Sequence, residues 1–177
     1  DVERSRGLGD VYKRQYNDTA TAISAMIKPH HHRDCVDKAL KNAQQICTQK
    51  NLKLTPIRAR VLELIWQSHK PIKAYDLLAK LSDSNHIEKP PTVYRALEFL
   101  MSHKFIHRIE SCNAYIGCEY GEEHHDSQFF ICDQCEQVKE VREPKLNQTL
   151  LETSEKQGFI PYQTSIEIHG TCAKCAK

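Results

Sequence analysis

Two Cys-x-x-Cys pairs near the end of this 177-residue chain constrain its fold more than any other feature. The first pair is Cys132 and Cys135, the second is Cys172 and Cys175, and 36 residues separate them. Each pair directs two thiolates at one point, and two such turns complete the tetrahedral four-sulfur shell of a structural Zn²⁺ site. The pairs therefore predict a structural zinc ion that joins the last strand of a domain to an earlier hairpin.

Redox chemistry is the alternative interpretation of a Cys-x-x-Cys motif. A thioredoxin-like dithiol opens a helix after a strand, whereas Cys132 and Cys135 lie between two short predicted strands. No apolar run approaches the roughly 18 residues that span a bilayer, and no secretory signal pattern is present. We therefore expect a soluble, cytoplasmic protein with no membrane partner. In that compartment, eight cysteines favour metal binding or redox chemistry over a disulfide framework.

Charge is distributed unevenly along the chain, although the net charge is only +2. Residues 36–110 contain 13 Lys and Arg against 7 Asp and Glu, whereas residues 111–177 contain 6 against 11. A basic half suits a polyanionic partner and an acidic half suits cations, but many solvated surfaces are equally uneven. The charge distribution alone therefore does not decide between binding surfaces of these kinds and an ordinary solvated surface.

Apolar residues at helical spacing predict four helices after an N-terminal stretch that lacks such a pattern. Residues 1–35, which include His30, His31 and His32, are expected to be a disordered or non-native extension. The helices are predicted over residues 36–51, from Pro56 through Trp66, and over 74–81 and 92–102. Strands at 105–110 and 114–118 follow at once as a hairpin. Helices followed by a hairpin is the order of a winged helix-turn-helix domain.

The remaining chain predicts a second, smaller domain. Strands at 128–131 and 137–142 bracket the first Cys-x-x-Cys turn, residues 144–157 form a helix, and an alternating strand over 162–168 delivers the second pair. We therefore predict an α+β protein: a winged helix-turn-helix domain, an acidic loop, and a small β-β-α-β domain with structural zinc.

A second group of possible metal ligands precedes and overlaps this zinc motif. It comprises His107, Cys118, His124, His125 and Glu140. Imidazole, thiolate and carboxylate together suit Zn²⁺, whereas a thiolate disfavours Mg²⁺ or Ca²⁺. Each residue alone could equally be an ordinary surface or core side chain. Four protein ligands leave no open position for catalysis, and no HExxH motif is present, so we expect no catalytic residues and no enzyme activity.

The segment from Pro90 to Leu97 has the pattern of a DNA-reading helix. Thr92, Tyr94 and Arg95 lie off its apolar stripe, near the N-terminal end. A recognition helix places that end in the major groove, where arginine can bond guanine O6 and N7 together. A solvated helix with an incidental arginine is the alternative, and this segment alone does not decide between them.

These motifs together resemble the Fur family of bacterial metalloregulators, most closely its zinc-sensing branch. The resemblance covers about residues 37–177 and is carried by several ordered motifs: Leu54-Thr55-Pro56-x-Arg58, Ala74-Tyr75-Asp76-Leu77-Leu78, Pro90-Pro91-Thr92-Val93-Tyr94-Arg95-Ala96-Leu97, Phe105-Ile106-His107-Arg108-Ile109-Glu110, Phe130-Ile131-Cys132-x-x-Cys135, Val138-Lys139-Glu140 and His169-Gly170-x-Cys172-x-x-Cys175.

The resemblance implies three parts: a winged-helix DNA-binding domain over 36–118, a hinge over 119–127, and a dimerisation and zinc-binding domain over 128–177. By position, it implies a regulatory zinc site of His107, Cys118, His125 and Glu140, with the choice between His124 and His125 open. Cys118 is the ligand that separates the zinc-sensing branch from iron-sensing relatives. Tyr75 joins Thr92, Tyr94 and Arg95 as a candidate DNA contact.

The expected protein is a homodimeric repressor of zinc-uptake genes that holds two Zn²⁺ per monomer and binds a palindromic operator in double-stranded DNA, with no small-molecule substrate. An iron- or peroxide-sensing regulator of the same family is the first rival. A dithiol oxidoreductase or a zinc hydrolase is the second.

Overall fold

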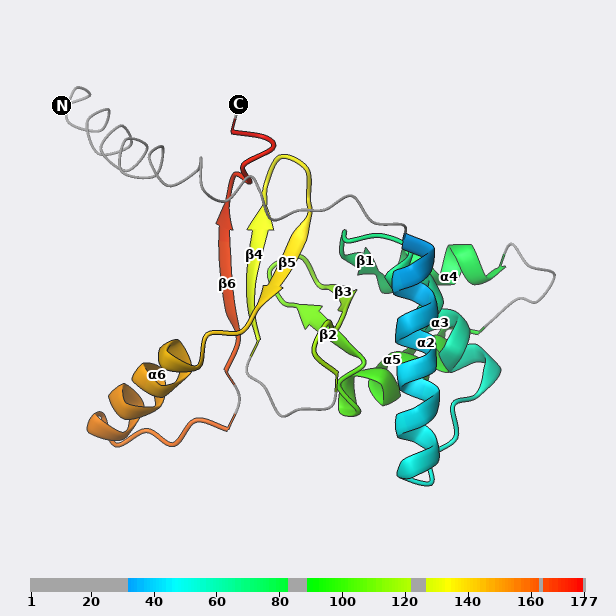
Figure 1. Cartoon of the computed structure of the whole chain (residues 1–177), viewed down its shortest axis with the longest axis horizontal. Helices are drawn as coiled ribbons and strands as arrows, with labels where there is room; N and C mark the ends of the chain where they lie inside the picture. Colours follow the sequence, from blue (N-terminus) through cyan, green and yellow to red (C-terminus); the bar gives the residue numbers. More distant parts are fainter. Residues whose placement is uncertain (1–31, 83–88, 122–126, 163, 177) are drawn as a thin grey trace.

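The computed structural model describes residues 32–82, 89–121, 127–162 and 164–176. His30, His31, His124 and His125 therefore lie outside the described residues. Within these ranges the chain has the predicted α+β architecture, with a helix-rich N-terminal part and two three-stranded sheets (Figure 1). None of the helices in the described part is long and apolar enough to cross a membrane.

The N-terminal half is built on four helices around one apolar core. They are α2 (His32–Gln49), α3 (Pro56–Trp66), α4 (Ala74–Ser82) and α5 (Pro90–Ser102), and α3 packs against both α2 and α5. The predicted stripes supply this core, as in α5, where every fully buried residue belongs to the stripe read from the sequence: Val93, Ala96, Leu97 and Leu100. Burial of such side chains contributes roughly 1.5–3 kcal/mol each relative to exposure.

Two helices begin earlier than the sequence pattern predicts. Helix α2 starts at His32, so residues 32–35 form its first turn and are not disordered. Helix α5 starts at Pro90, so both prolines lie within its first turn. Proline fits there because its fixed φ is helical and the amide it lacks would have had no partner inside the helix.

The wing is the hairpin of β2 (Ile106–Ile109) and β3 (Ala114–Gly117), extended by β1 (Ile72–Lys73) on the outer edge of β3. Strand β1 has no recognisable signal in the sequence, since two residues after a proline carry no detectable period. Gly117 lies where the indole of Trp66 crosses β3, and a Cβ atom there would collide with the ring. This close approach requires glycine.

The second domain has the predicted β-β-α-β order. Strand β4 (Gln128–Cys132) pairs antiparallel with β5 (Val138–Val141) and parallel with β6 (Ile166–Gly170), and α6 (Pro144–Lys156) connects β5 to β6. The Glu143 side chain accepts a hydrogen bond from the Lys145 amide and caps α6. Helix α6 extends away from the sheet (Figure 1), and none of its residues is buried.

The wing and the second sheet share a small apolar cluster. Ile109 and Ile116 of the wing pack with Phe129 and Val138 of the second domain, and Ile131 lies beside them. Phe129 and Ile131 alternate with Phe130, which is 45% exposed on the opposite face of the sheet. The two domains are therefore joined by apolar packing as well as by the loop between them.

Candidate metal centres and nucleic-acid interface

The four cysteines of the Cys-x-x-Cys pairs converge at one end of the second sheet. Cys132 ends β4, Cys135 lies in the turn between β4 and β5, and Cys172 and Cys175 follow β6, the parallel neighbour of β4. The four sulfur atoms all lie within 4.8 Å of one another. The Sγ atoms of Cys135 and Cys172 are 3.8 Å apart, which is about the separation of two sulfurs bound 2.3 Å from a tetrahedral Zn²⁺. The donor set fits this ion.

Backbone amides favour the thiolate form of one cysteine in this cluster, Cys132. The Cys172 amide donates to Cys132 Sγ at 3.3 Å. Hydrogen bonds from the Cys172 and Cys135 amides lower the pKa of Cys132 to about 6. A thiolate is the form that binds metal, so the local backbone prepares the first ligand.

A second cluster brings together three residues of the mixed set. His107 comes from β2, Cys118 follows β3 at the open end of the wing, and Glu140 comes from β5. Their ligand atoms lie within 4.8 Å of one another, and His107 Nε2 is 2.9 Å from Glu140 Oε1. The side chains are 12% and 2% exposed, respectively. Imidazole, thiolate and carboxylate in a nearly dry site fit Zn²⁺.

Glu140 is a buried carboxylate whose charge is balanced by its neighbours. Burial opposes its ionisation, but the hydrogen bond and charge of His107, the Ser127 hydroxyl and the Glu119 amide together lower its pKa to about 2. The Glu119 amide donates to Oε2 at 2.7 Å, and the Ser127 hydroxyl donates to Oε1. Buried charges persist where such partners are present.

Cys118 has the opposite electrostatics. Burial and the nearby Glu140 carboxylate raise its pKa to about 12. The thiol is therefore protonated at neutral pH in the metal-free protein. A metal ion that binds there must displace the proton.

Ser127 also belongs to this site, although a serine carries no metal-ligand signal in the sequence. Its hydroxyl donates to Glu140 and lies 3.4 Å from His107 Nε2. His169, in the His-Gly-x-Cys motif, lies away from this cluster and contacts Asp133 and Ser111 instead. The proposed fourth ligand, His125, and its alternative His124 lie outside the described residues.

The polar end of α5 presents the residues that the sequence singled out. Tyr94 is 53% exposed, Arg95 is also exposed, and Thr92 is half-buried, while Tyr75 at the start of α4 is 79% exposed. The Arg58 guanidinium stacks on Phe99 of α5, 3.5 Å from the ring centroid, which ties α3 to α5. This arrangement leaves the α5 N-terminal surface open to solvent.

Comparison with known proteins decides which family has this combination of folds and clusters. Residues 49–169 match the ferric uptake regulator family.

The chain belongs to that family, the Fur family.

Individual relatives lie on its zinc branch. A zinc uptake regulation protein of Escherichia coli (strain K12) is 42% identical over 139 residues, which are 78% of this chain and 81% of the relative. A solved zinc uptake regulator in complex with zinc and DNA superposes with a TM-score of 0.75 at 41% identity, covering 79% of this chain and 94% of the other. The holo form of the regulator XcZur superposes at 0.73 with 40% identity, over 77% and 96% of the two chains. This Fur-family chain therefore resembles zinc uptake regulators in both sequence and structure.

Proposed function

We propose that the chain is a zinc-responsive, DNA-binding transcriptional repressor of zinc-uptake genes and acts as a homodimer without enzymatic activity. One observation carries the proposal: ligand atoms of His107 and Cys118, from the wing, and of Glu140, from the second domain, lie within 4.8 Å of one another. A ligand that needs both domains favours the arrangement in which they are joined. Similarity to the Escherichia coli zinc uptake regulation protein supports zinc as that ligand.

The two clusters support the proposal of two zinc sites per monomer. Cys132, Cys135, Cys172 and Cys175 would hold the structural ion, and His107, Cys118, His125 and Glu140 the regulatory one. With the domain boundaries we propose, at 36–118, 119–127 and 128–177, the proposed regulatory ligands come from all three parts. Helix α2 begins at His32, slightly before the first boundary. When bound, the regulatory Zn²⁺ would be held by residues of the wing, the hinge and the second domain together.

Neighbouring groups orient and shield the proposed ligands of the regulatory site. Ser127 and the Glu119 amide orient Glu140 toward His107, and the apolar cluster around Phe129 excludes water beside it. His107 contacts the Phe129 ring edge-on, with centroids 5.3 Å apart. Loss of the Cys118 proton on binding leaves a thiolate in a buried site, where its attraction to a cation is strong.

DNA recognition is assigned to the exposed N-terminal part of α5. Arg95 would read a guanine in the major groove, with Tyr94 and Thr92 beside it and Tyr75 as a flanking contact. The zinc uptake regulator solved with zinc and DNA supports this choice of partner. Two copies related by a two-fold axis would match a palindromic operator.

An unburied apolar face supports the homodimer. Leu146, Leu150 and Leu151, predicted to line one side of α6, are 37%, 38% and 45% exposed in the monomer. Phe130 and Ile168, paired in register on the outer face of the second sheet, are both 45% exposed. Such an apolar surface is typical of a protein interface, and a second copy offers the same surface in return.

The test is a titration of operator binding against free Zn²⁺ with total zinc per monomer measured in parallel. We expect one tightly held equivalent that does not alter binding and a second whose uptake coincides with operator binding. Operator binding that is independent of free zinc, or that responds to iron instead, would overturn the proposal.

A further inference from the structure

The turn of the wing is held against β6 by polar contacts that lie outside both metal clusters. The backbone amides of Glu110 and Ser111 donate to the two carboxylate oxygens of Glu167, at 2.6 and 3.1 Å. A carboxylate that accepts from two successive amides fixes both the position and the orientation of the turn. Burial opposes ionisation of Glu167, but the Ser111 hydroxyl and these two amides outweigh it and lower its pKa.

His169 continues these contacts to the first Cys-x-x-Cys turn. Its Nε2 atom lies 3.2 Å from the Ser111 hydroxyl, and its Nδ1 atom lies 2.9 Å from a carboxylate oxygen of Asp133. Asp133 follows Cys132 directly, and its amide donates to the Gly170 carbonyl at 2.9 Å. A continuous set of hydrogen bonds therefore runs from the wing turn through β6 to the four-cysteine cluster.

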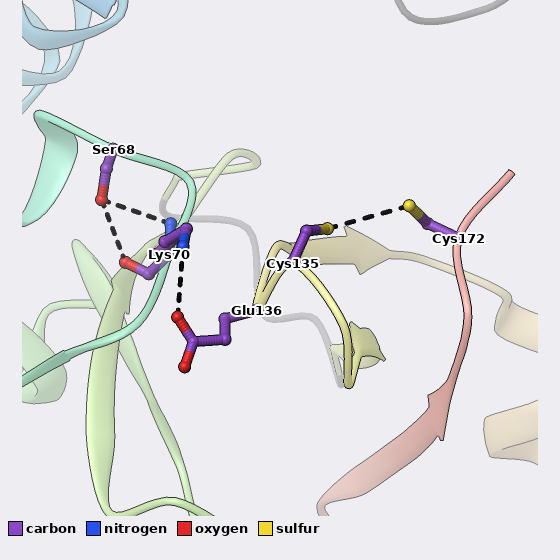
Figure 2. Close-up of polar contacts among 5 residues, drawn as sticks. All are labelled: Ser68, Lys70, Cys135, Glu136 and Cys172. Carbon is purple, nitrogen blue, oxygen red and sulfur yellow. Dashed lines mark hydrogen bonds and ion pairs between the residues drawn. The ribbon is translucent and has the colours of Figure 1, made fainter. Parts of the chain in front are cut away.

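The loop between α3 and β1 provides a second attachment of the N-terminal domain to the first Cys-x-x-Cys turn. Lys70 Nζ lies 3.1 Å from Glu136, the residue after Cys135, and the Val138 amide donates to the His69 carbonyl at 3.0 Å. Figure 2 shows Lys70 reaching Glu136 while Cys135 faces Cys172. The ion pair is exposed and contributes little by itself. The backbone hydrogen bond fixes where the loop lies.

The hydrogen bonds that Glu167 and His169 make with the wing and the mixed cluster lie at opposite ends of the wing. His107 and Cys118 are at its open end, whereas Glu110 and Ser111 form its turn. Ile109 and Ile116 pack between the two ends against Phe129 and Val138. The wing is therefore held at the turn by groups that need no regulatory metal.

We propose that Glu167 and His169 form a wing clasp, a metal-independent contact with Glu110 and Ser111 that positions the DNA-binding domain for operator binding. The inference rests on the proposed function, which it deepens by naming positioning residues. Both the clasp and zinc at the mixed cluster favour the same arrangement of the two domains. By linkage, loss of the clasp must weaken zinc binding at the mixed cluster by the factor by which zinc strengthens the clasp.

The test compares Glu167→Ala, Glu167→Gln and Ser111→Ala in the full-length, zinc-loaded protein, with Glu155→Ala on the exposed surface of α6 as the control. Three quantities are measured: amide hydrogen exchange at residues 110 and 111 by NMR, operator affinity at saturating zinc, and zinc affinity of the weaker site. For Glu167→Ala we expect faster exchange at both amides and a loss of roughly fivefold to tenfold in each affinity, the lower range of coupling between sites. Glu167→Gln keeps one carbonyl acceptor and should lose less.

The sign of the effect separates the clasp from simple electrostatics. Removing an acidic residue strengthens attraction to DNA, so a weaker operator complex cannot come from the lost charge, and Glu155→Ala should bind as the parent does or slightly tighter. Ser111 belongs to neither metal cluster, so a loss of affinity in Ser111→Ala with both zinc equivalents retained supports the clasp independently of Glu167.

Unchanged exchange at residues 110 and 111 in Glu167→Ala, or unchanged operator and zinc affinities in both Glu167→Ala and Ser111→Ala, would overturn the inference. If the parent binds no operator in response to zinc, the proposed function fails. Amide exchange and zinc affinity would still decide whether the clasp exists.

Discussion

The imidazole Nε2 atom of His107, on the wing, lies 2.9 Å from a carboxylate oxygen of Glu140, on β5. Nitrogen and oxygen ligands of one tetrahedral Zn²⁺ lie about 3.3 Å apart, given bond lengths near 2.0 Å. Zinc binding therefore requires only a small increase in the distance between these two atoms. The same contact helps to lower the pKa of the buried Glu140 carboxyl and brings a residue of the wing against a residue of β5.

Cys118→Ser should abolish zinc-induced operator binding while the fold, the dimer and the structural zinc remain. A serine hydroxyl is a far poorer Zn²⁺ ligand than a thiolate, and Cys118 belongs to the mixed cluster alone. We expect the free zinc needed for activation to rise by at least about 100-fold, the upper limit for loss of an outer-shell partner. Measured zinc should fall from two equivalents to one. Repression at the parent's zinc level would place the sensing site elsewhere.

Ser127→Ala should weaken the regulatory site without removing a ligand. The Ser127 hydroxyl donates to Glu140 and lies beside His107, so its loss frees the carboxylate to rotate and reduces support for both ligands. Outer-shell partners of this kind typically change metal affinity by about 10–100-fold. Competition with a zinc chelator measures the change. Thr149→Ala on exposed α6 is the control, and equal affinities for Ser127→Ala and the parent would contradict the prediction.

Zinc binding at the mixed cluster should weaken as pH falls. Because burial raises the pKa of Cys118 from 9.0 to about 12, its thiol stays protonated across neutral pH and each bound ion releases that proton. Affinity should therefore drop about tenfold per pH unit from this thiol alone. Calorimetry in buffers of different ionisation enthalpy counts the protons released. Release of fewer than one proton per ion bound at this site by the parent at neutral pH would contradict the assignment.

Cys132→Ser and Cys172→Ser should each unfold the second domain and prevent dimerisation. A structural zinc ion supplies folding free energy directly, on the order of 10 kcal/mol at neutral pH in small zinc domains. Thermal unfolding and sedimentation report the two effects. Cys112→Ser, at the wing turn and outside both clusters, is the matched control. A dimeric Cys132→Ser variant of unchanged thermal stability would exclude the structural role.

Arg95→Ala should weaken operator binding by about 1–3 kcal/mol and relax the base preference at one position in each half-site. The arginine is exposed near the α5 N-terminus, where bidentate contact with guanine is possible. Binding to a panel of operator variants tests this at fixed salt and saturating zinc. An equal loss for every sequence would make Arg95 a phosphate contact.

The four-cysteine cluster could be predicted from the sequence because each half of it is a local turn. Cys132 and Cys135 are three residues apart, as are Cys172 and Cys175, so the chain brings each pair together regardless of the rest of the fold. The helices could be predicted equally well, since an apolar stripe such as that of α5 repeats within one element. For the mixed cluster, spacing alone allowed several choices, and resemblance to the Fur family narrowed them.

What the sequence determined by itself is therefore local: helix and strand order, the Cys-x-x-Cys turns, and the polar face of α5. Only the tertiary structure shows that Ser127 donates to Glu140 and that β1 joins the wing. It also shows that the α6 leucines are exposed in the monomer and that Glu167 accepts a hydrogen bond from the wing turn, 56 residues away in sequence. The physical reason is that periodicity records which face of an element is apolar. The partner of that face depends on the register and placement of another element, which only the folded chain defines.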